Sequence, residues 1–344
     1  MTHYFVTGGA GFIGSNYVAR LLERGEQVTV YDNLSRAGAT RNLDWLRQRF
    51  GADSFRLVVG DVRDFDLLLA SSRQADVFVH LAAQVAVTSS VSDPRQDFEI
   101  NALGTFNTVE AARLNGNNPI FLYASTNKVY GGMEEVRVVE GTTRWEYQDL
   151  PFGCPETQPL DFHSPYGVSK GCGDQYVRDY ARIYGLRSVV FRQSCIYGPR
   201  QFGIEDQGWV AWFIIAAITG RPITIYGDGK QVRDVLYVDD LLDAYDAAIK
   251  HIDQAKGQIY NLGGGPQNTL SVWAEFGPLL ERLLGRPVPV QYGDWRPGDQ
   301  RVFIADIRKA ERELGWRPRV GVEEGIRRLV AWVQENRALF APDS

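Results

Sequence analysis

The sequence predicts an α/β protein with a doubly wound parallel sheet and a smaller α/β lobe toward the C-terminus. Three observations indicate this fold class. Short runs rich in Val and Phe alternate with longer stretches of helical period through the first half of the chain. A glycine-rich turn joins the first strand to the first helix. The 344 residues are 44% hydrophobic, which is enough for a sizeable core in about one to two domains.

The first βαβ unit comprises a strand at residues 4–7, a helix at 13–23 and a strand at 27–31. Because strands separated by helices pair in parallel, we expect the elements that follow to extend the same sheet. The further strands are predicted at residues 55–59, 77–80, 120–123 and 188–191, and the long helices at residues 98–114 and 166–184.

The alternation loosens after Ser194, where turns containing Gly and Pro separate shorter elements. We therefore expect a first domain at residues 1–194 and a smaller lobe at 195–344, with some crossing of the chain between them. Helices at residues 307–314 and 323–335 close the chain. Residues 131–160 show no clear period, and a loop of this length is more often functional than a simple connector. We expect it to cover the functional site.

Charge and composition exclude several classes of protein. The net charge of −5 provides no basic field for nucleic acid. Cys154, Cys172 and Cys195 form neither a Cys-x-x-Cys pair nor an even set, and no His-x-x-x-His pair exists, so we expect a reducing compartment and no metal site. No secretory signal is visible, and the longest apolar run is about half of the roughly 20 residues that span a bilayer. These observations predict a cytoplasmic protein that does not enter the membrane.

The glycine-rich turn, residues 7–14, predicts a site for a dinucleotide pyrophosphate. Gly8 permits the tight turn, Gly11 lets backbone amides approach the phosphates, and Gly14 lets the helix pack on the strand. The N-terminus of the following helix adds free N–H groups and partial positive charge. Glycines in such turns also occur for packing alone, so the prediction depends on the residues around them.

Asp32 supplies that context, because it ends the second predicted strand and can accept hydrogen bonds from the adenosine ribose. An acidic residue at this place favours NAD over NADP. Arg36 follows closely and would suit a 2′-phosphate instead, so NADP is the alternative.

Tyr166 and Lys170 lie one helical turn apart, so both side chains emerge on one face of their helix. A nearby ammonium favours the phenolate, and we expect it to lower the Tyr pKa toward working pH. Thr126 follows the strand at residues 120–123, at the carboxyl edge where open α/β sheets bind ligands. A lone Tyr-x-x-x-Lys is more often a surface pair, but the combination with Thr126 predicts proton transfer at a sugar hydroxyl.

In kind and order these features resemble the extended short-chain dehydrogenase/reductase family, over nearly the whole chain. The resemblance implies a Rossmann-like domain that holds tightly bound NAD and a second lobe that holds a nucleotide-diphosphate sugar. It implies that Thr126, Tyr166 and Lys170 are catalytic. The cofactor contacts that it implies are Gly8, Gly11, Phe12, Ile13, Gly14, Asp32, Asn33, Ser35, Arg36, Asp61, Val62, Leu81, Ala82, Ala83, Gln84, Asn101, Ala124, Ser125, Tyr166 and Lys170.

The two residues after the catalytic Thr distinguish branches of this family. Dehydratases carry an Asp-Glu pair there to eliminate water, whereas this chain has Asn127 and Lys128. Longer motifs, among them residues 125–131, 161–167 and 299–303, resemble the CDP-paratose (CDP-tyvelose) 2-epimerase group. The resemblance implies epimerisation of a CDP-sugar, possible substrates including CDP-glucose, at C2 through a 2-keto intermediate. A UDP-sugar 4-epimerase and a non-catalytic NAD-binding regulator of the same fold are the alternatives.

Arg233 and Arg301 are candidates for the substrate diphosphate, because forked guanidinium groups match phosphate oxygens. The helices at residues 98–114 and 166–184 are candidates for pairing in a homodimer or homotetramer, as family members often pair through two helices. His80 and the pair Trp209 and Trp212 are expected to have structural roles. The complete set of expected substrate contacts is Gln84, Thr126, Asn127, Lys128, His163, Gln193, Ser194, Gln207, Gly208, Lys230, Gln231, Arg233 and Arg301.

Overall fold

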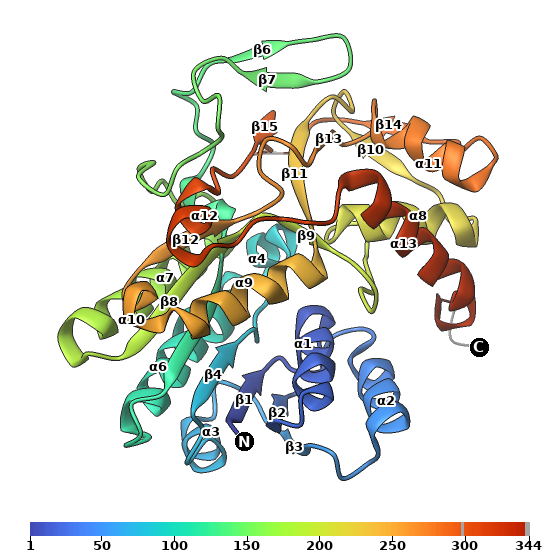
Figure 1. The fold of residues 1–344 in the computed structure, drawn as a ribbon. Coiled ribbons are helices and arrows are strands. Elements are labelled where there is room, and N and C mark those ends of the chain that lie inside the picture. The colour runs from blue at the N-terminus through green and yellow to red at the C-terminus, as the bar shows by residue number, and fades with distance from the viewer. Residues whose placement is uncertain (297–298, 341–344) are drawn as a thin grey trace.

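The computed structural model describes residues 1–296 and 299–340, and its centre is a seven-stranded parallel sheet (Figure 1). The strand order is β12-β8-β5-β4-β1-β2-β3, and each neighbouring pair is parallel. This order confirms the predicted doubly wound sheet. The strands are β1 (His3–Thr7), β2 (Gln27–Asp32), β3 (Arg56–Val59), β4 (Val77–His80), β5 (Ile120–Thr126), β8 (Arg187–Gln193) and β12 (Ile259–Leu262).

Helices cover both faces of this sheet, which explains why its strands read as continuous apolar runs. Phe5 and Phe78 face one hydrophobic cluster, whereas their neighbours Val6 and Val79 face the other. The first face packs against α3 (Phe65–Ser71), α6 (Gly104–Leu114) and α7 (Ser164–Tyr184). The second face packs against α1 (Phe12–Glu23), α2 (Ala39–Phe50) and α9 (Val238–Lys250).

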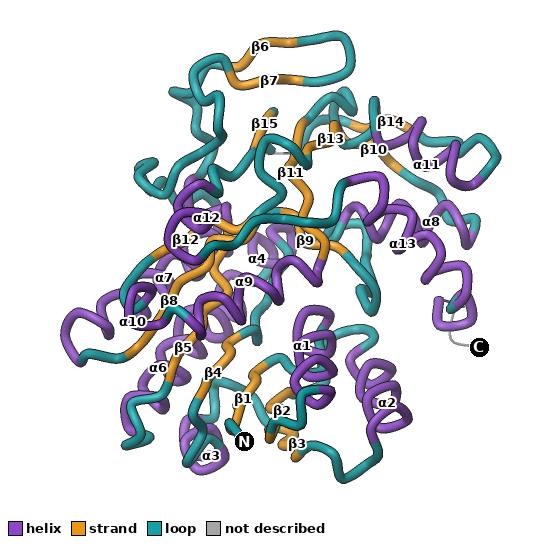
Figure 2. Tube along the Cα trace, in the orientation of Figure 1, coloured by secondary structure: helices purple, strands orange, loops and turns teal. Residues whose placement is uncertain are grey.

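The second lobe follows β8 directly and lies over the carboxyl edge of the sheet (Figures 1 and 2). The chain crosses back, because β12 from the second half adds the outermost strand of the large sheet. The lobe's strands are β9 (Cys195–Tyr197), β10 (Thr224–Tyr226), β11 (Val232–Tyr237), β13 (Thr269–Ser271), β14 (Gln291–Gly293) and β15 (Val302–Phe303). Its helices are α8 (Trp209–Thr219), α10 (Ile252–Ala255), α11 (Phe276–Leu284), α12 (Arg308–Leu314), α13 (Val322–Glu335) and η3 (Arg337–Phe340).

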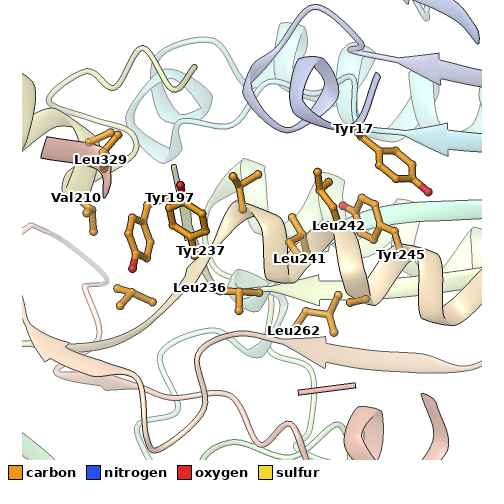
Figure 3. Packing of buried hydrophobic residues seen from close by; sticks show 14 of the residues in the cluster. Tyr17, Tyr197, Val210, Leu236, Tyr237, Leu241, Leu242, Tyr245, Leu262 and Leu329 are labelled. Atoms are coloured by element: carbon orange, nitrogen blue, oxygen red, sulfur yellow. The ribbon is translucent and has the colours of Figure 1, made fainter. Parts of the chain in front are cut away.

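One hydrophobic core joins the two lobes, as the close view shows (Figure 3). Tyr17 from α1 packs edge-on against Tyr245 from α9, with ring centroids 5.6 Å apart. Tyr197 and Tyr237 continue this core toward α13. Because the lobes share this core, the second lobe is held in a fixed place above the carboxyl edge.

Three local features differ from the sequence-based expectations. The helix expected at residues 98–114 begins as a π-helix, η1 (Phe98–Leu103), before α6, and such turns are frequent at functional sites. Helices α2 and α3 were not predicted. Residues 131–160 contain a hairpin of β6 (Val138–Glu140) and β7 (Trp145–Tyr147), whose strands are too short to show a period. The remaining short helices are α4 (Val87–Ser92), α5 (Pro94–Asp97) and η2 (Asn127–Tyr130).

Within the described ranges, no helix has the length and apolar character needed to cross a membrane. The most apolar helix, α8, has 11 residues, and most of its side chains are buried in the shared core.

Candidate active site

Thr126, Tyr166 and Lys170 meet where the carboxyl end of β5 approaches the first turns of α7. The Thr126 hydroxyl forms a hydrogen bond with Tyr166. Lys170 Nζ donates to the carbonyl of Ala124 at 2.6 Å and lies 4.4 Å from the ring centroid of Tyr123. All three candidate catalytic side chains are buried, with at most 8% exposed. The structure therefore brings together the three residues that the spacing singled out.

Burial has the largest effect on the pKa values of Tyr166 and Lys170. It raises the pKa of Tyr166 to about 12, against the opposing effect of the Thr126 hydrogen bond, and lowers the pKa of Lys170 to about 7. Burial is thus the largest influence on the Tyr166 pKa, and the expectation that Lys170 draws this pKa toward working pH stays a prediction. The physical reason is that a dry site favours the neutral form of both groups. Ionising Tyr166 requires additional positive charge near the phenol.

His80 supports this arrangement through its contact with Tyr123 and does not itself face the site. Its two ring nitrogens lie 2.7 Å from Thr7 Oγ1 and 3.0 Å from Thr105 Oγ1, and its ring stacks on Tyr123. Complete burial lowers the pKa of His80 to about 3, so the imidazole is neutral. The hydroxyl of Tyr123 donates to the backbone carbonyl of Lys170 at 3.2 Å. His80 has the structural surroundings expected of it.

The glycine-rich turn has the geometry that each of its predicted roles needs. Gly8 has a φ of +69°, and a Cβ there would lie 2.7 Å from the Ala82 amide nitrogen. A Cβ on Gly14 would lie 2.2 Å from the Gly8 carbonyl, so only glycine lets α1 pack this closely. Gly11 caps α1 without a side-chain hydrogen bond, and the first turn, which includes Phe12 and Ile13, contains no acidic residue. The amides at the start of α1 are thus available to an anion.

Asp32 ends β2 beside this turn. Its carboxylate accepts hydrogen bonds from the Ala10 amide at 3.0 Å and the Leu34 amide at 2.8 Å, which leaves each oxygen with a second lone pair. The neighbouring predicted cofactor contacts are linked to each other: Asn33 Nδ2 donates to Asp61 Oδ2 at 2.9 Å, and Ser35 Oγ donates to Asn33 Oδ1. Val62 packs under the N-terminus of α6.

Arg36 and Gln207 are in contact, although Arg36 was predicted to bind cofactor and Gln207 substrate. Both residues line a small cavity with Gly11 and Phe12. In the same cavity, Asn42 Oδ1 and Gln201 Oε1 have no hydrogen-bond partner among the residues described. Buried acceptors without partners suit a polar ligand that brings its own donors. Gly208 follows directly and precedes α8.

The predicted substrate residues include two cations that lie close together. Arg233 is 7% exposed and donates to Asp299 at 2.6 Å. Burial and the charge of Arg233 lower the pKa of Lys128, whose ammonium has no hydrogen-bond or ion-pair partner within residues 1–296 and 299–340. Asn127 lies between Lys128 and Thr126 and contacts the Thr126 hydroxyl. A half-buried ammonium without a partner suits an anionic or oxygen-rich ligand here.

Comparison with known proteins places this geometry in a family. The model of the GDP-mannose 4,6-dehydratase family matches residues 5–329. The chain is 44% identical over 334 residues to a CDP-paratose 2-epimerase of Salmonella typhi, covering 95% of this chain and 98% of that protein. The chain belongs to the extended short-chain dehydrogenase/reductase family.

Solved structures of this family share the whole fold. A UDP-glucose 4-epimerase from Thermotoga maritima, crystallised with UDP-glucose, is 32% identical with a TM-score of 0.83, over 98% of this chain and 100% of that one. A dTDP-glucose 4,6-dehydratase from Streptomyces venezuelae, solved with NAD bound, has the same identity and TM-score over 98% of each chain. As a member of this family, the protein is an NAD-dependent nucleotide-sugar enzyme of the epimerase and dehydratase type. The choice between NAD and NADP is thereby decided for NAD.

The residues present fit an NAD molecule. The open amides of α1 suit the pyrophosphate, and the second lone pairs of Asp32 suit a ribose diol. Leu81 and Ala82, at the end of β4, are fixed by hydrogen bonds from their amides to Thr7, and Ala83 follows them. Within the described part of the chain, no cluster of His, Cys, Asp or Glu side chains could hold a metal ion.

Several expected ligand contacts are engaged inside the protein. Ser125 Oγ donates to the buried Asp174 at 2.8 Å, and His163 lies 3.2 Å from Asp161. Trp209 packs against Phe213 and Phe276, as expected for a core residue. Three other predicted substrate residues also form hydrogen bonds within the protein: Gln193 with Tyr245, Ser194 with Asp234, and Gln231 with the carbonyl of Tyr226.

The hairpin of β6 and β7 is fastened to the second lobe by residues that were expected to contact substrate. Lys230 Nζ lies 2.7 Å from Glu140 Oε1, and the Arg301 guanidinium lies 4.4 Å from the Trp145 ring centroid. Trp145 Nε1 donates to Asp228 at 2.8 Å. In Figure 1 the hairpin stands above β11 and β15, far from the amino edge of the sheet.

Asp97 is one of two buried acids near the candidate catalytic group that sequence reasoning missed, the other being Asp174. Asp97 ends α5, is fully buried, and accepts hydrogen bonds at Oδ1 from Gln84 Nε2 and Asn101 Nδ2, each at 2.9 Å. Its charge raises the pKa values of both Tyr166 and Lys170. Only the tertiary packing of α5 and η1 on α7 reveals this proximity, because no spacing in the sequence links Asp97 to the helix.

Proposed function

We propose that this protein epimerises a CDP-sugar at C2, by oxidation to a 2-keto sugar and return of hydride to the opposite face. The observation that supports it most is the replacement of a dehydratase acid–base pair by Asn127 and Lys128 beside an intact Thr126, Tyr166 and Lys170 group. Neither Asn127 nor Lys128 offers a carboxyl group for eliminating water. The 44% identity to a CDP-paratose 2-epimerase supports the choice of nucleotide and carbon.

NAD, when bound along the glycine-rich turn and Asp32, supplies the hydride acceptor and then the hydride donor. The C2 carbon has no acidic hydrogen before oxidation, so inversion requires this transient redox step. Tyr166 accepts the proton of the C2 hydroxyl while the C2 hydrogen leaves as hydride. In the return step Tyr166 gives its proton back to the keto oxygen. Atoms and electrons balance over the cycle, and no outside oxidant is consumed.

Thr126 and Lys170 support Tyr166 in different ways. The Thr126 hydroxyl forms a hydrogen bond to Tyr166 and thereby lowers the pKa that burial has raised. Lys170 provides the nearby positive charge that stabilises the phenolate. Burial brings the Lys170 pKa to about 7. The protonation state of Lys170 therefore responds to other charged groups that enter the site. The positive charge of oxidised nicotinamide favours the phenolate.

Lys128 and Arg233 are the residues that we assign to the negatively charged substrate. Arg233 is held by Asp299, whereas Lys128 is free to pair with an incoming oxygen. A diphosphate would pair with the half-buried ammonium of Lys128 and with the forked guanidinium of Arg233. Lys128 follows β5 at the carboxyl edge of the large sheet, where ligands of this fold class bind, and Arg233 lies at the start of β11 in the second lobe.

We also propose that α6 and α7 pair with a second copy of the chain. Together with η1, which leads into α6, these helices carry apolar side chains that are 38–66% exposed: Phe98, Leu103, Leu114, Val168, Tyr176, Ile183 and Tyr184. Phe106 and Tyr176 meet edge-on at 5.5 Å and join the two helices into one face. Contiguous apolar surfaces of this kind mark protein interfaces, and two such helix pairs would form a four-helix bundle.

Proton NMR of the purified protein with separate sugar nucleotides tests this function. The samples contain CDP-paratose, CDP-glucose, UDP-glucose or UDP-glucuronate, without added NAD. We expect the H1–H2 coupling to change only with a CDP-sugar. A change of the H3–H4 coupling with a UDP-sugar would instead favour a 4-epimerase, the activity of a 34% identical relative from Mycolicibacterium smegmatis. Complete inactivity with NAD still bound would favour a regulator.

A further inference from the structure

A second cavity, of about 610 Å³, lies beside α7, lined on that helix by Gln175 and Arg178 and by none of its exposed apolar side chains. Its walls come from α7, α12, the start of β12 and the segment at residues 156–160, and Figure 1 shows these elements side by side. None of the residues assigned above to catalysis, cofactor or substrate lines it. The volume is in the usual range for a small-molecule site, roughly 300–1,000 Å³.

The lining of this cavity is strongly cationic. Five of its residues are basic and two are acidic, and its only aliphatic members are Leu160 and Ile259. Of the acids, Asp306 is already paired with Arg308 at 2.7 Å, and Glu156 accepts a hydrogen bond from the Asn261 amide. The basic residues are Arg178, Arg192, Arg308, Lys309 and Arg312.

Arg178 is the unsatisfied member of this set. It has neither a hydrogen bond nor an ion pair with any residue that the structure describes. Burial and the nearby charges of Arg182 and Arg192 lower its pKa, against the opposing charge of Asp174. Lys309 Nζ is positioned by Gln258 Oε1 at 3.0 Å and the Ile259 carbonyl at 2.9 Å, which leaves one N–H free.

Arg192 makes the inner wall rigid. Its side chain is 2% exposed and donates two hydrogen bonds to Asp174, at 2.9 and 3.0 Å, and a third to the hydroxyl of Tyr130 at 3.1 Å. Because these partners occupy Arg192, it contributes charge and shape. Arg178, the free N–H of Lys309, and Nη1 of Arg308, which the pairing with Asp306 leaves unused, can contact a ligand. An ordinary solvated helix face would not close around a buried guanidinium in this way.

We propose that this cavity binds a small phosphorylated molecule, with the phosphate among Arg178, Arg308 and Lys309. Guanidinium groups form bidentate hydrogen bonds with phosphate oxygens, and a lysine adds a point charge. Thr157, Gln175 and Gln258 add polar groups for the rest of the ligand. The scarcity of apolar lining argues against a lipid or aromatic ligand.

Isothermal titration calorimetry of the NAD-loaded protein with inorganic pyrophosphate tests this proposal. The Arg233→Gln variant removes competing binding at the substrate site, and further changes are made in that background. We expect Arg178→Gln to weaken pyrophosphate binding at least about tenfold, since it removes a charge-assisted contact. Arg182→Gln, on the same helix but outside the cavity, should leave the affinity unchanged.

Arg308→Gln provides a second probe at the exposed rim, where misfolding is not expected. It should also weaken binding. The proposal is overturned if Arg233→Gln alone abolishes all pyrophosphate binding. It is equally overturned if Arg178→Gln and Arg308→Gln, folded by circular dichroism, both bind pyrophosphate as tightly as their parent.

Discussion

Lys230 Nζ lies 2.7 Å from Glu140 Oε1 and ties the second lobe to the tip region of the β6–β7 hairpin. Arg144 and Glu275 form a second ion pair between hairpin and lobe. The hairpin belongs to residues 131–160, which were predicted from the sequence to cover the functional site. These two ion pairs hold the hairpin against the second lobe.

Breaking this pair should weaken substrate binding modestly. Lys230 and Glu140 are 27% and 50% exposed, and such pairs contribute up to about 1 kcal/mol. We expect Glu140→Gln and Lys230→Gln each to raise KM by no more than about fivefold with little change in kcat, and the double variant to match the singles. Glu146→Gln, on the same hairpin, is the control. If Lys230→Gln proves far worse than Glu140→Gln, Lys230 contacts substrate directly.

Removing the charge of Asp97 should move the pH profile of kcat. Asp97→Asn keeps an oxygen that can accept from Gln84 and Asn101. Since the Asp97 charge raises the pKa values of Tyr166 and Lys170, both limbs of the profile should move to lower pH. Asp93→Asn, which removes a nearby charge but keeps an oxygen to cap α5, is the control and should not move the limbs. Unmoved limbs in Asp97→Asn would refute the electrostatic role.

Lys170 should make the stability of the protein without NAD depend on pH. Its folded pKa of about 7 is below the ordinary lysine value of 10.5, so between these values the unfolded state binds more protons. The free energy of unfolding therefore rises with pH across that window, by about 3–5 kcal/mol at most. Thermal melts of wild type and Lys170→Met at several pH values measure it. A difference between the two proteins that stays constant from pH 7 to 10 would contradict the assignment.

Charges placed on the outer face of α7 should prevent pairing of two chains. Tyr176 and Ile183 are 44% and 66% exposed and lie on that face. We expect the double variant Tyr176→Glu and Ile183→Lys to sediment as a monomer in analytical ultracentrifugation. Val59→Glu, at the edge strand β3, is the matched control and should keep the wild-type mass. A wild-type protein that is itself monomeric at micromolar concentration would exclude the proposed pairing.

Local patterns were sufficient for the parts of the site that depend on short spacing. The turn at Gly8 and Gly14, Asp32 at the end of β2, and the Tyr166 and Lys170 pair all depend on one strand end or one helix face. The parallel sheet was predicted for the same reason, since alternating periods determine it. Each of these site features is encoded within a few neighbouring residues, and the sheet is encoded in the alternation of strand and helix periods along the chain.

The features that were missed depend on tertiary contacts. Asp97 becomes important only because η1 and α5 pack on α7, and the π-helical turn at residues 98–103 interrupts an amphipathic pattern that reads as α-helix. The elevated pKa of Tyr166 follows from burial, which the presence of Lys170 in the sequence does not reveal. Likewise, the partners of Lys230 and Arg301 lie in a hairpin with strands of three residues, too short to predict.

Transfer of the C2 hydrogen as hydride is the central claim, and an isotope measurement tests it most directly. CDP-paratose carrying deuterium at C2 is incubated with the protein in ordinary water, without added NAD, and the product is analysed by mass spectrometry. Hydride transfer predicts that the C2 epimer retains its deuterium, and that Tyr166→Phe forms it at least about a hundredfold more slowly. A C2 epimer that has exchanged its deuterium for solvent hydrogen from the first turnover would contradict the account.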